Sequence, residues 1–338
     1  MSVRMPLRLP ARRCSIGWMA LAGLLVVSIA APQAARAQSS WPVRPVKIVV
    51  PMPPGGGTDA WARMAAEKFS EILGQPFVVD NRPGAGTMIG AELVAKAAPD
   101  GYTLLIGDIG TYSVNPNLYR RIAYDPAKDL APVTLTARHL LGLVVPASSD
   151  VTSVQQLVEK ARSRPGALNY GSAGIGSPHH LAMALFERTA GVQMNHVPYK
   201  GGAPLAADML AGQLDAAFID LPTALPLVRA GKLRAIAVST RERLDLLPGV
   251  TTLVELGYAD YRAEAWQGLM VPAGTPEDII GRLNAAYARA ITDPAFRRRF
   301  ADIGIELTPS TPQEFDAFRR AETARWGVLI REKGISAD

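Results

Sequence analysis

The sequence predicts an α/β protein built from two lobes, and three observations lead to this expectation. Short runs of β-branched residues alternate along the chain with longer segments of helical periodicity, which is typical of βαβ units and largely parallel sheets. Once a predicted leader is removed, the remaining 301 residues suit two lobes of ordinary size. One strand-like segment also resembles another that lies about 126 residues further on.

Residues 1–37 form the predicted leader. They begin with four arginines and no acidic residue, continue with an apolar run over residues 16–31, and end in Ala35-Arg36-Ala37. These three parts define a secretory signal peptide that is cleaved near Ala37. The alternative is a membrane anchor, but an apolar run of about 16 residues is shorter than the roughly 20 needed to span a bilayer. We therefore expect an exported protein.

Removing the leader changes the charge of the chain. The leader contains five basic residues, so the formal charge falls from +6 to about +1. A nearly neutral protein lacks the excess of positive charge that is typical of proteins that bind nucleic acid. Cys14 is the single cysteine and belongs to the leader. The mature chain is therefore expected to contain no disulfide, no thiol nucleophile and no thiolate metal ligand.

The elements follow from the alternation of these patterns. Strands are expected where Val, Ile, Leu or aromatic residues cluster in short runs: 46–50, 77–79, 102–106, 141–145, 168–170, 195–198, 216–219, 233–238 and 268–271. Helices are expected where apolar residues recur at helical spacing: 59–73, 88–97, 154–163, 178–190, 204–211, 222–230, 276–291, 294–301 and 312–332. Several of these helices begin at a proline, where a missing N–H costs little.

Residues 140–147 (Leu-Leu-Gly-Leu-Val-Val-Pro-Ala) resemble residues 266–273 (Trp-Gln-Gly-Leu-Met-Val-Pro-Ala). Each segment reads as an apolar strand that ends in Pro-Ala before a new helix. We interpret them as two segments that cross between lobes, the alternative being coincidence between common strand–turn–helix starts. This interpretation predicts a first lobe of residues 38–140 and 265–338 and a second lobe of residues 141–264.

The loop at residues 53–59 (Pro-Pro-Gly-Gly-Gly-Thr-Asp) lies between the first predicted strand and helix. Its glycines allow the backbone N–H groups to approach a ligand, and the N-terminus of the following helix favours an anion. The alternative is a turn with Thr58 or Asp59 as the helix cap, although three glycines exceed what a cap requires. The ligand-binding candidates here are Pro54, Gly55, Gly56, Thr58 and Asp59.

A second loop of the same kind spans residues 170–180 (Tyr-Gly-Ser-Ala-Gly-Ile-Gly-Ser-Pro-His-His). Its glycines expose backbone amides and its serines add hydroxyls. Two such loops on opposite lobes predict a cleft that closes on an anion. The candidates in this loop are Ser172, Ala173, Gly176 and Ser177. Of His179 and His180, we expect one to close the loop and the other to face solvent.

A third set of candidates follows two later strands. Lys200 precedes two glycines and is suited either to a carboxylate or to solvent. Asp220 follows the buried strand 216–219, where it either accepts a hydrogen bond from a ligand or caps the next helix. Gly201 and Asp220 are included among the predicted ligand-binding residues.

Enzyme motifs fit poorly. No loop contains the Gly-Lys-Ser/Thr of a phosphate-binding loop, and Ala60 stands where a dinucleotide fingerprint needs its third glycine. Tyr170 replaces the first glycine of a nucleophile elbow around Ser172. The four histidines lack metal-ligand spacing. We therefore expect no catalytic residue, no metal and no cofactor.

The whole mature chain closely resembles the substrate-binding receptors of tripartite tricarboxylate transporters, the Bug or TctC family. The resemblance rests on both glycine-rich loops and on a series of ordered matches: Trp-Pro-Val-Arg-Pro at 41–45, Leu-Gly-Gln-Pro at 73–76, Val-Asp-Asn-Arg-Pro-Gly-Ala-Gly at 79–86, Ala-Ala-Pro-Asp-Gly-Tyr-Thr-Leu at 97–104, Asn-Pro-Asn-Leu-Tyr at 115–119, Pro-Tyr-Lys-Gly-Gly at 198–202, and Ala-Gly-Lys-Leu-Arg-Ala at 230–235.

The resemblance implies a two-lobed periplasmic binding protein fold, similar to type II, that closes on its ligand. In such receptors backbone amides and hydroxyls of two facing loops hold a carboxylate, which agrees with both loops described above; Thr111 is a further lining candidate. The implied ligand is a small organic acid, such as a di- or tricarboxylate, an aromatic acid or an acidic amino acid. The implied partner of this monomer is a membrane permease or a sensor protein.

Two other functions stay open at this point. One is a periplasmic hydrolase that uses Ser172 or Ser177 as its nucleophile. The other is a signalling receptor whose closed form docks on a sensor protein. The distal end of the ligand is the least defined part of the site, because residues 108–112 (Asp-Ile-Gly-Thr-Tyr) differ from the smaller, serine-rich residues of many relatives.

Overall fold

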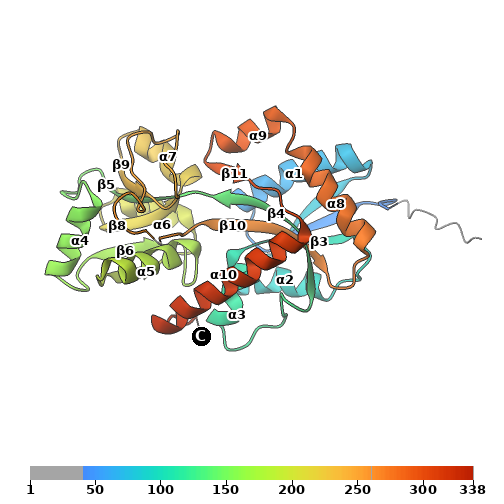
Figure 1. Cartoon of the computed structure of the whole chain (residues 1–338), viewed down its shortest axis with the longest axis horizontal. Coiled ribbons are helices and arrows are strands. Elements are labelled where there is room, and N and C mark those ends of the chain that lie inside the picture. Colours follow the sequence, from blue (N-terminus) through green and yellow to red (C-terminus); the bar gives the residue numbers. More distant parts are fainter. Residues whose placement is uncertain (1–40, 260, 338) are drawn as a thin grey trace, which may run out of the picture. The chain divides into compact units, whose positions relative to one another are not determined.

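A computed structural model describes residues 41–259 and 261–337, and from Pro42 onward the chain forms one compact unit. The predicted signal peptide and its cleavage site lie outside the described residues. None of the helices described has both the length and the apolar character needed to cross a bilayer. The core consists of two separate β-sheets with helices packed on them (Figure 1).

The first sheet has six strands in the order β11-β4-β10-β3-β1-β2. Its strands are β1 (Val46–Val50), β2 (Phe77–Asn81), β3 (Thr103–Asp108), β4 (Leu130–His139), β10 (Ala265–Pro272) and β11 (Ile305–Leu307). The helices whose residues lie between or after these strands are α1 (Gly57–Leu73), α2 (Met88–Ala95), α3 (Asn115–Leu118), α8 (Glu277–Ala290), α9 (Pro294–Ala301) and α10 (Pro312–Glu332). A 3₁₀ turn at Ala85–Thr87 precedes α2, and a π-helical turn at Gly110–Val114 precedes α3.

The second sheet has five strands in the order β7-β6-β8-β5-β9. Its strands are β5 (Leu141–Pro146), β6 (Asn169–Ser172), β7 (Asn195–Pro198), β8 (Ala216–Asp220) and β9 (Leu233–Val238). The helices between them are α4 (Val154–Ser163), α5 (Pro178–Ala190), α6 (Gly202–Leu210) and α7 (Leu221–Arg229). The α/β architecture with two lobes is therefore confirmed.

The expectation of mainly parallel sheets was wrong, because both sheets are mixed. β1, β2 and β3 pair in parallel, as do β6, β7 and β8. By contrast, β10 is antiparallel to β3 and β4, β11 is antiparallel to β4, and β5 is antiparallel to β8 and β9. β5 and β10 each start where the chain arrives from the other sheet, beside the carboxyl ends of the parallel strands, so they must run in the opposite direction.

The sequence missed β4 and β11. β4 contains Pro132, and a proline inside a run of residues argues against a central strand because it removes a ladder hydrogen bond. The strand tolerates it because its pairing with β10 is irregular, with register shifts at Gln267/Gly268 and at Leu269/Met270. β4 leads directly into β5, so the chain passes from the first sheet to the second at Leu140 (Figure 1).

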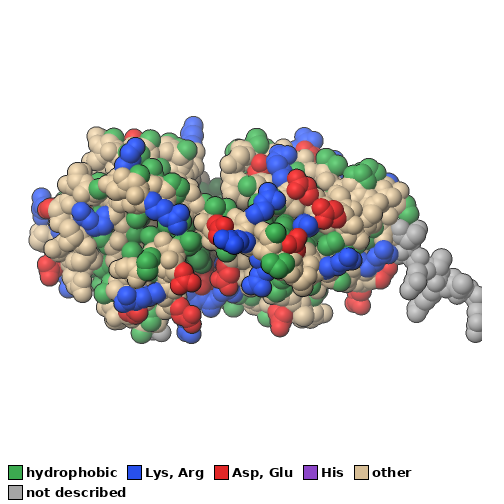
Figure 2. Space-filling model, turned by 90° about the horizontal axis from the view of Figure 1, so that it is seen from above, with side chains coloured by type: hydrophobic (Ala, Val, Ile, Leu, Met, Phe, Trp, Pro, Cys, Tyr) green, Lys and Arg blue, Asp and Glu red, His purple; other side chains and the backbone are tan. Residues whose placement is uncertain are grey.

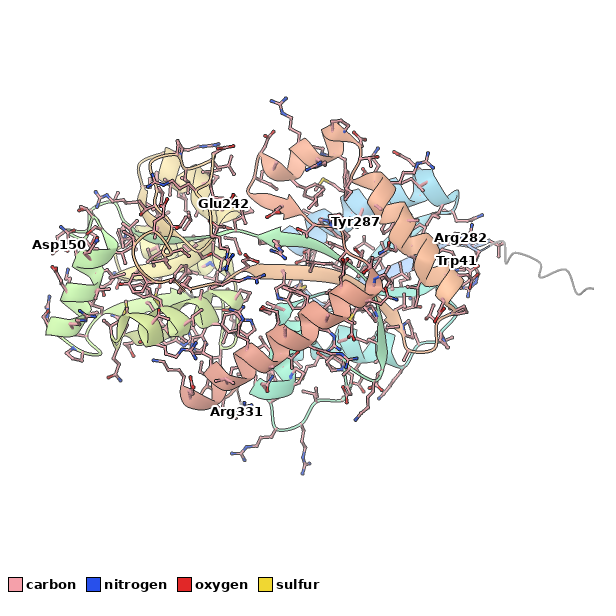
Figure 3. All side chains as sticks on the ribbon, in the orientation of Figure 1. Trp41, Asp150, Glu242, Arg282, Tyr287 and Arg331 are labelled. Atoms are coloured by element: carbon pink, nitrogen blue, oxygen red, sulfur yellow. The ribbon has the colours of Figure 1, made fainter. Side chains whose placement is uncertain are left out.

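The C-terminal helix α10 joins the packing of both sheets. It starts with a capping box between Thr311 and Glu314. Its Trp326 and Leu329 belong to the same buried cluster as Leu181 of α5. Figure 3 shows Arg331 near the end of α10, and the neighbouring Glu332 forms a 2.9 Å ion pair with Arg188 of α5. The helix thus extends from the first sheet to the second.

Candidate functional site

A cavity of about 540 Å³ lies between the two sheets, and Figure 2 shows the surface hollowed between the corresponding halves of the molecule. Segments of both sheets form its wall. The lining residues are Met52, Pro53, Gly57, Thr58, Gly86, Thr87, Asp108, Gly110, Asn115, Tyr119, His139, Ala173, Gly174, Ile175, Gly176, Ser177, Pro178, His179, Lys200, Gly201, Asp220, Pro222, Thr223, Ala265, Trp266 and Gln267.

The cavity lies at the carboxyl ends of the parallel strands of both sheets. Residues in the loops after β1, β2, β6 and β7, together with the last residues of β3 and β8, all contribute to its wall. Loops at this end of a parallel sheet are free to contact a ligand, because the strand ends leave a crevice between neighbouring connections. The fold therefore gathers six strand ends from two sheets around one space.

Five helices of eight or more residues direct their N-termini to this cavity. The first residues or N-caps that line it are Gly57 of α1, Thr87 of α2, Ser177 of α5, Gly201 of α6 and Asp220 of α7. Free N–H groups and the positive end of the helix dipole make each N-terminus favourable for an anion. Lys200 is the only Lys or Arg among the described residues that line the cavity. Backbone donors thus supply most of the attraction for a negative charge.

The carboxylate of Asp59 points into its own loop instead of the cavity. It accepts hydrogen bonds from the Gly55 N–H (2.9 Å), from Arg63 Nε (3.1 Å) and from Asn81 Nδ2 (2.9 Å). Burial raises the pKa of Asp59, but the donors of Arg63, Gly55 and Asn81 more than offset this, and the pKa lies below its ordinary value. Asp59 therefore fixes the first loop against the second strand.

Replacing Asp59 with alanine is expected to lower the free energy of unfolding by about 1–3 kcal/mol, because three hydrogen bonds to a charged acceptor are lost. The lowered pKa means that the contribution is fully present above pH ~4 and is lost as the pH falls through the folded-state value. Urea unfolding from pH 7 to pH 3 measures this difference. The exposed Asp302 replaced by alanine is the control, and a wild-type advantage that persisted unchanged at pH 3 would contradict the assignment.

A stack of aromatic rings supports the second loop from behind. His180 Nδ1 accepts the Gly176 N–H at 3.0 Å, and the His180 ring lies 3.8 Å from that of His196. His196 Nε2 hydrogen-bonds to Ser172 Oγ at 2.7 Å, which holds this buried hydroxyl away from the cavity. Burial lowers the pKa of His180 to about 3 and that of His196 to about 4, so both rings are neutral above these values.

His179 and His180 have different roles, and neither faces solvent. His180 closes the second loop as expected, but the prediction that the other histidine is exposed was wrong, since both are buried. His179 Nε2 lies 3.0 Å from Asp220 Oδ2. Burial alone would raise the pKa of Asp220, yet the adjacent His179 reverses this, and the pKa lies below its ordinary value. The pair joins the start of α5 to the start of α7.

The turn before α2 is strained and is held by hydrogen bonds. Thr87 has φ +80°, which is uncommon for a β-branched residue. Its hydroxyl accepts from Asn115 Nδ2 (3.3 Å) and lies 2.9 Å from Thr111 Oγ1. The single hydroxyl proton of Thr111 goes to Asp108 Oδ1 at 2.8 Å, so Thr87 is the donor to Thr111. Such strain persists where surrounding contacts fix it, and it is frequent at ligand-binding sites.

Half of the predicted ligand-binding residues line the cavity, and the other half do not. Those that line the cavity are Thr58, Ala173, Gly176, Ser177, Gly201 and Asp220. Those that do not are Pro54, Gly55, Gly56, Asp59, Thr111 and Ser172. Ligand contact by any of them stays a prediction.

Sequence reasoning missed the part of the wall that comes from β4, from β10, from the turn before α2 and from the end of β3. His139, Gln267, Thr87 and Asp108 belong to this part. Only Asp108 had a usable signal, since it lies just after the carboxyl end of the predicted strand 102–106, whereas Thr87 lies well beyond the strand predicted at 77–79. His139 and Gln267 had none, because their place depends on the direction and register of two strands that cross between sheets.

A family model described as tripartite tricarboxylate transporter family receptor matches residues 61–335. Protein BugT of Bordetella pertussis is 36% identical over 319 residues, covering 94% of this chain and 97% of BugT. The structure of Rpa4515 from R. palustris with adipate is 40% identical, with a TM-score of 0.81 over 88% of this chain and 99% of that one. MatC from Rhodopseudomonas palustris with bound malate is 34% identical, with a TM-score of 0.77 over 86% of this chain and 99% of that one.

Proposed function

The chain belongs to the tripartite tricarboxylate transporter receptor family, and from this membership we propose that it captures a small organic carboxylate in the cavity and delivers it to a membrane permease. Receptors of this family are periplasmic solute-binding proteins. The two similar proteins whose structures contain adipate and malate support a carboxylate as the ligand class. Binding without turnover, cleavage of a signal peptide near Ala37 and a monomeric state are parts of the same proposal.

The convergence of five helix N-termini on one cavity is the observation that carries this proposal. A carboxylate placed there meets free backbone N–H groups from both sheets, in a space partly shielded from water. A volume of about 540 Å³ falls within the range of small-molecule sites and exceeds what a single ion needs. A multi-atom organic anion fits these features.

We also propose the division into lobes that the sequence predicted, with residues 38–140 and 265–338 in one lobe and 141–264 in the other. The membership of the strands supports it, since β5 to β9 form one sheet and all other strands form the second. β5 and β10, which contain the two similar segments, have equivalent antiparallel places in their sheets. A ligand that contacts both lobes favours the closed form because it binds that form more tightly.

The hydrolase alternative lacks support from the site and from the relatives. Ser172 is fully buried and hydrogen-bonded behind the loop, and the Ser177 hydroxyl accepts the His180 N–H as the cap of α5. Neither hydroxyl is paired with a base that also faces the cavity. A signalling output likewise has no observation in its favour.

The proposed function predicts that carboxylates, but not the matching carboxamides, raise the melting temperature of the refolded mature protein. A ligand that binds only the folded state adds about 2.7 kcal/mol at a hundredfold excess over its Kd. Unfolding, dialysis and refolding before the measurement remove retained ligand. No response to mono-, di- or tricarboxylates of three to eight carbons would contradict the proposal, as would an equal response to carboxamides.

Lys200 gives a second, milder test of the same proposal. Replacing Lys200 with alanine is expected to raise the Kd for the carboxylate by about twofold to fivefold, since an exposed charge pair contributes modestly. Titration calorimetry at low and high salt measures the effect, which should shrink as salt screens the charge. Lys232 replaced by alanine is the control, because it is an exposed lysine outside the cavity. Equal effects of the two changes would argue against a ligand at the start of α6.

A further inference from the structure

Asp108 and Gln267 lie opposite each other on neighbouring strands at the cavity wall. They are register partners in the antiparallel pairing of β3 with β10. Directly opposed residues of an antiparallel pair project their side chains from the same face of the sheet, with Cβ atoms about 5 Å apart. Both residues line the cavity. Their polar groups therefore border the same part of it, although no hydrogen bond joins the two side chains.

The amide of Gln267 has a donor without a partner. Gln267 is fully buried, and its Oε1 lies 3.1 Å from His139 Nε2. An amide oxygen only accepts, so His139 carries its proton on Nε2. Gln267 Nε2 has no hydrogen-bond partner among the described residues. A buried N–H₂ group without a partner is costly, and Gln267 is one of the residues that line the cavity.

Asp108 offers an acceptor on the facing strand. Its Oδ1 accepts both the N–H of Thr111 (2.9 Å) and the hydroxyl of Thr111 (2.8 Å). No hydrogen bond from another described residue reaches Oδ2. Burial raises the pKa of Asp108, with the two Thr111 donors and the nearby His139 opposing that rise. The carboxyl group thus has no ion-pair partner within the described part of the chain, in contrast to Asp220 beside His179.

A group between these two side chains must accept from Gln267 Nε2 and donate to Asp108 Oδ2. A carboxylate only accepts and an ammonium only donates, whereas a hydroxyl does both. A carboxylate at this position would also face the charge of Asp108 in a partly buried space. The pair is therefore matched to a hydroxyl and mismatched to either charged group.

We propose that the ligand is a hydroxy-substituted carboxylate whose hydroxyl bridges Gln267 and Asp108. This inference rests on the proposed function, because it takes the carboxylate at the helix N-termini as given. It adds a recognition element that the glycine-rich loops do not contain, and it assigns selectivity to β3 and β10 of the first sheet. Thr111 and His139 act as positioning residues, since each fixes one member of the pair.

The experiment compares acids that differ by one hydroxyl: malate with succinate, 3-hydroxybutyrate with butyrate, and 3-hydroxyadipate with adipate. Titration calorimetry on the refolded mature protein gives the ratio of Kd values in each pair. In the pair whose carbon chain fits, the hydroxy acid is expected to bind about 10- to 100-fold more tightly, as hydrogen bonds to a charged and a buried partner are gained.

Two variants test the bridging residues. Asp108→Asn keeps the shape of the side chain and an oxygen for Thr111, but replaces the acceptor with a donor. Gln267→Leu removes the unpaired donor. In each variant the preference for the hydroxy acid is expected to fall to within about threefold. The preference is the ratio of two Kd values for one variant, so a change in affinity that both acids share cancels. The control is Asp302→Asn. Asp302 is exposed at the C-terminal end of α9, and the preference of this variant is expected to equal the wild-type value.

The outcomes separate this inference from the proposed function. If the wild-type protein binds a parent acid as tightly as its hydroxy form in every pair, the hydroxyl bridge is wrong and the carboxylate receptor stands. If no acid of either kind binds, both are wrong. A preference that survives in Asp108→Asn and in Gln267→Leu would place the hydroxyl elsewhere in the cavity. The wild-type ratios decide the first question even if a variant fails to fold.

Discussion

Replacing Gly176 with alanine is expected to weaken carboxylate binding by about tenfold or more, because the added methyl group would push the two lobes apart. Gly176 lines the cavity in the loop after β6 and has φ +73°. A Cβ there would lie 2.4 Å from Leu118 Cδ2 and 3.3 Å from Val114 Cγ1, both of which precede β4 in the first lobe. The loop after β6 and the segment that contains Val114 and Leu118 would have to move apart to relieve this contact.

Gly191 provides a matched control for the backbone strain. It ends α5 with φ +63°, and a Cβ there would meet nothing within 4 Å. Alanine at either glycine is expected to lower the free energy of unfolding by about 1–2 kcal/mol, since L residues disfavour left-handed backbone. Only the change at Gly176 should also weaken binding. Calorimetric titration of both variants with the same acid separates strain from the contact between lobes.

A double mutant tests the contact directly. Replacing Leu118 with valine removes the δ-methyl groups that the new Cβ would meet, so it should restore part of the affinity lost in the Gly176→Ala variant. The coupling between the two changes is then measured by a double-mutant cycle. Equal affinities of the Gly176→Ala and Gly191→Ala variants, or additive effects in the cycle, would show that this contact does not govern closure.

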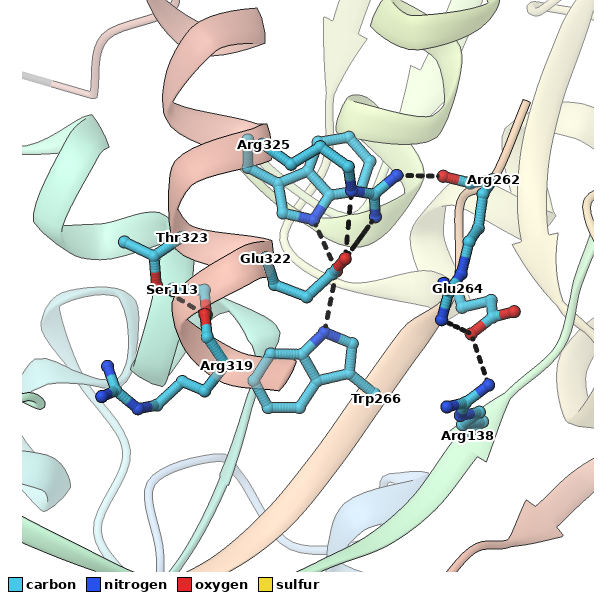
Figure 4. A network of polar contacts seen from close by, with 10 residues as sticks. Ser113, Arg138, Arg262, Glu264, Trp266, Arg319, Glu322, Thr323 and Arg325 are labelled. Atoms are coloured by element: carbon cyan, nitrogen blue, oxygen red, sulfur yellow. Dashed lines mark hydrogen bonds and ion pairs between the residues drawn. The ribbon is translucent and has the colours of Figure 1, made fainter. Parts of the chain in front are cut away.

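Replacing Glu322 with alanine is expected to lower the free energy of unfolding by about 3–5 kcal/mol, more than the change at Asp59 or at either glycine. Glu322 of α10 is buried and accepts the indole N–H groups of Trp266 (3.1 Å) and Trp326 (2.9 Å). It also pairs with Arg325 at 2.8 Å, and Arg325 in turn donates to the Arg262 carbonyl (Figure 4). Removing the carboxylate leaves two indole donors without their acceptor.

The matched control is Glu332→Ala on the same helix. Glu332 forms an ion pair with Arg188, but both side chains are about half exposed, so the loss should stay within about 1 kcal/mol. Chemical unfolding of the two variants in parallel gives the comparison. Similar losses in both would mean that the buried network contributes no more than a surface ion pair. Because Trp266 lines the cavity beside Gln267, the Glu322 variant should also bind ligand less tightly.

Most helices and strands could be predicted because their determinants are local. α4, α5, α9 and α10 begin and end where the periodicity and the proline positions placed them. The two glycine-rich loops were likewise found from sequence, since backbone turns next to a helix start require particular residues at fixed positions. The family resemblance then gave the solute-binding function.

The side-chain directions within those loops could not be predicted. Asp59 was expected to contact a ligand, yet its carboxylate accepts hydrogen bonds from the Gly55 N–H and from Asn81. These donors stabilise the carboxylate in this orientation. Ser172 turns away in the same manner, toward His196, which lies 24 residues later. Sequence spacing carries no signal for a partner on another strand.

By itself the sequence determined the α/β class, the two loops and the order of the elements other than β4 and β11, all of which follow from short-range periodicity and turn chemistry. Only the tertiary structure decided that β5 and β10 run antiparallel to their neighbours and that Pro132 lies within a strand. It alone placed Asp108 opposite Gln267 and brought His139 beside them. The contacts of Gln267 with these two residues join positions more than 100 apart, and they arise from the register between β10 and its two neighbours in the first sheet, which no local pattern in the sequence determines.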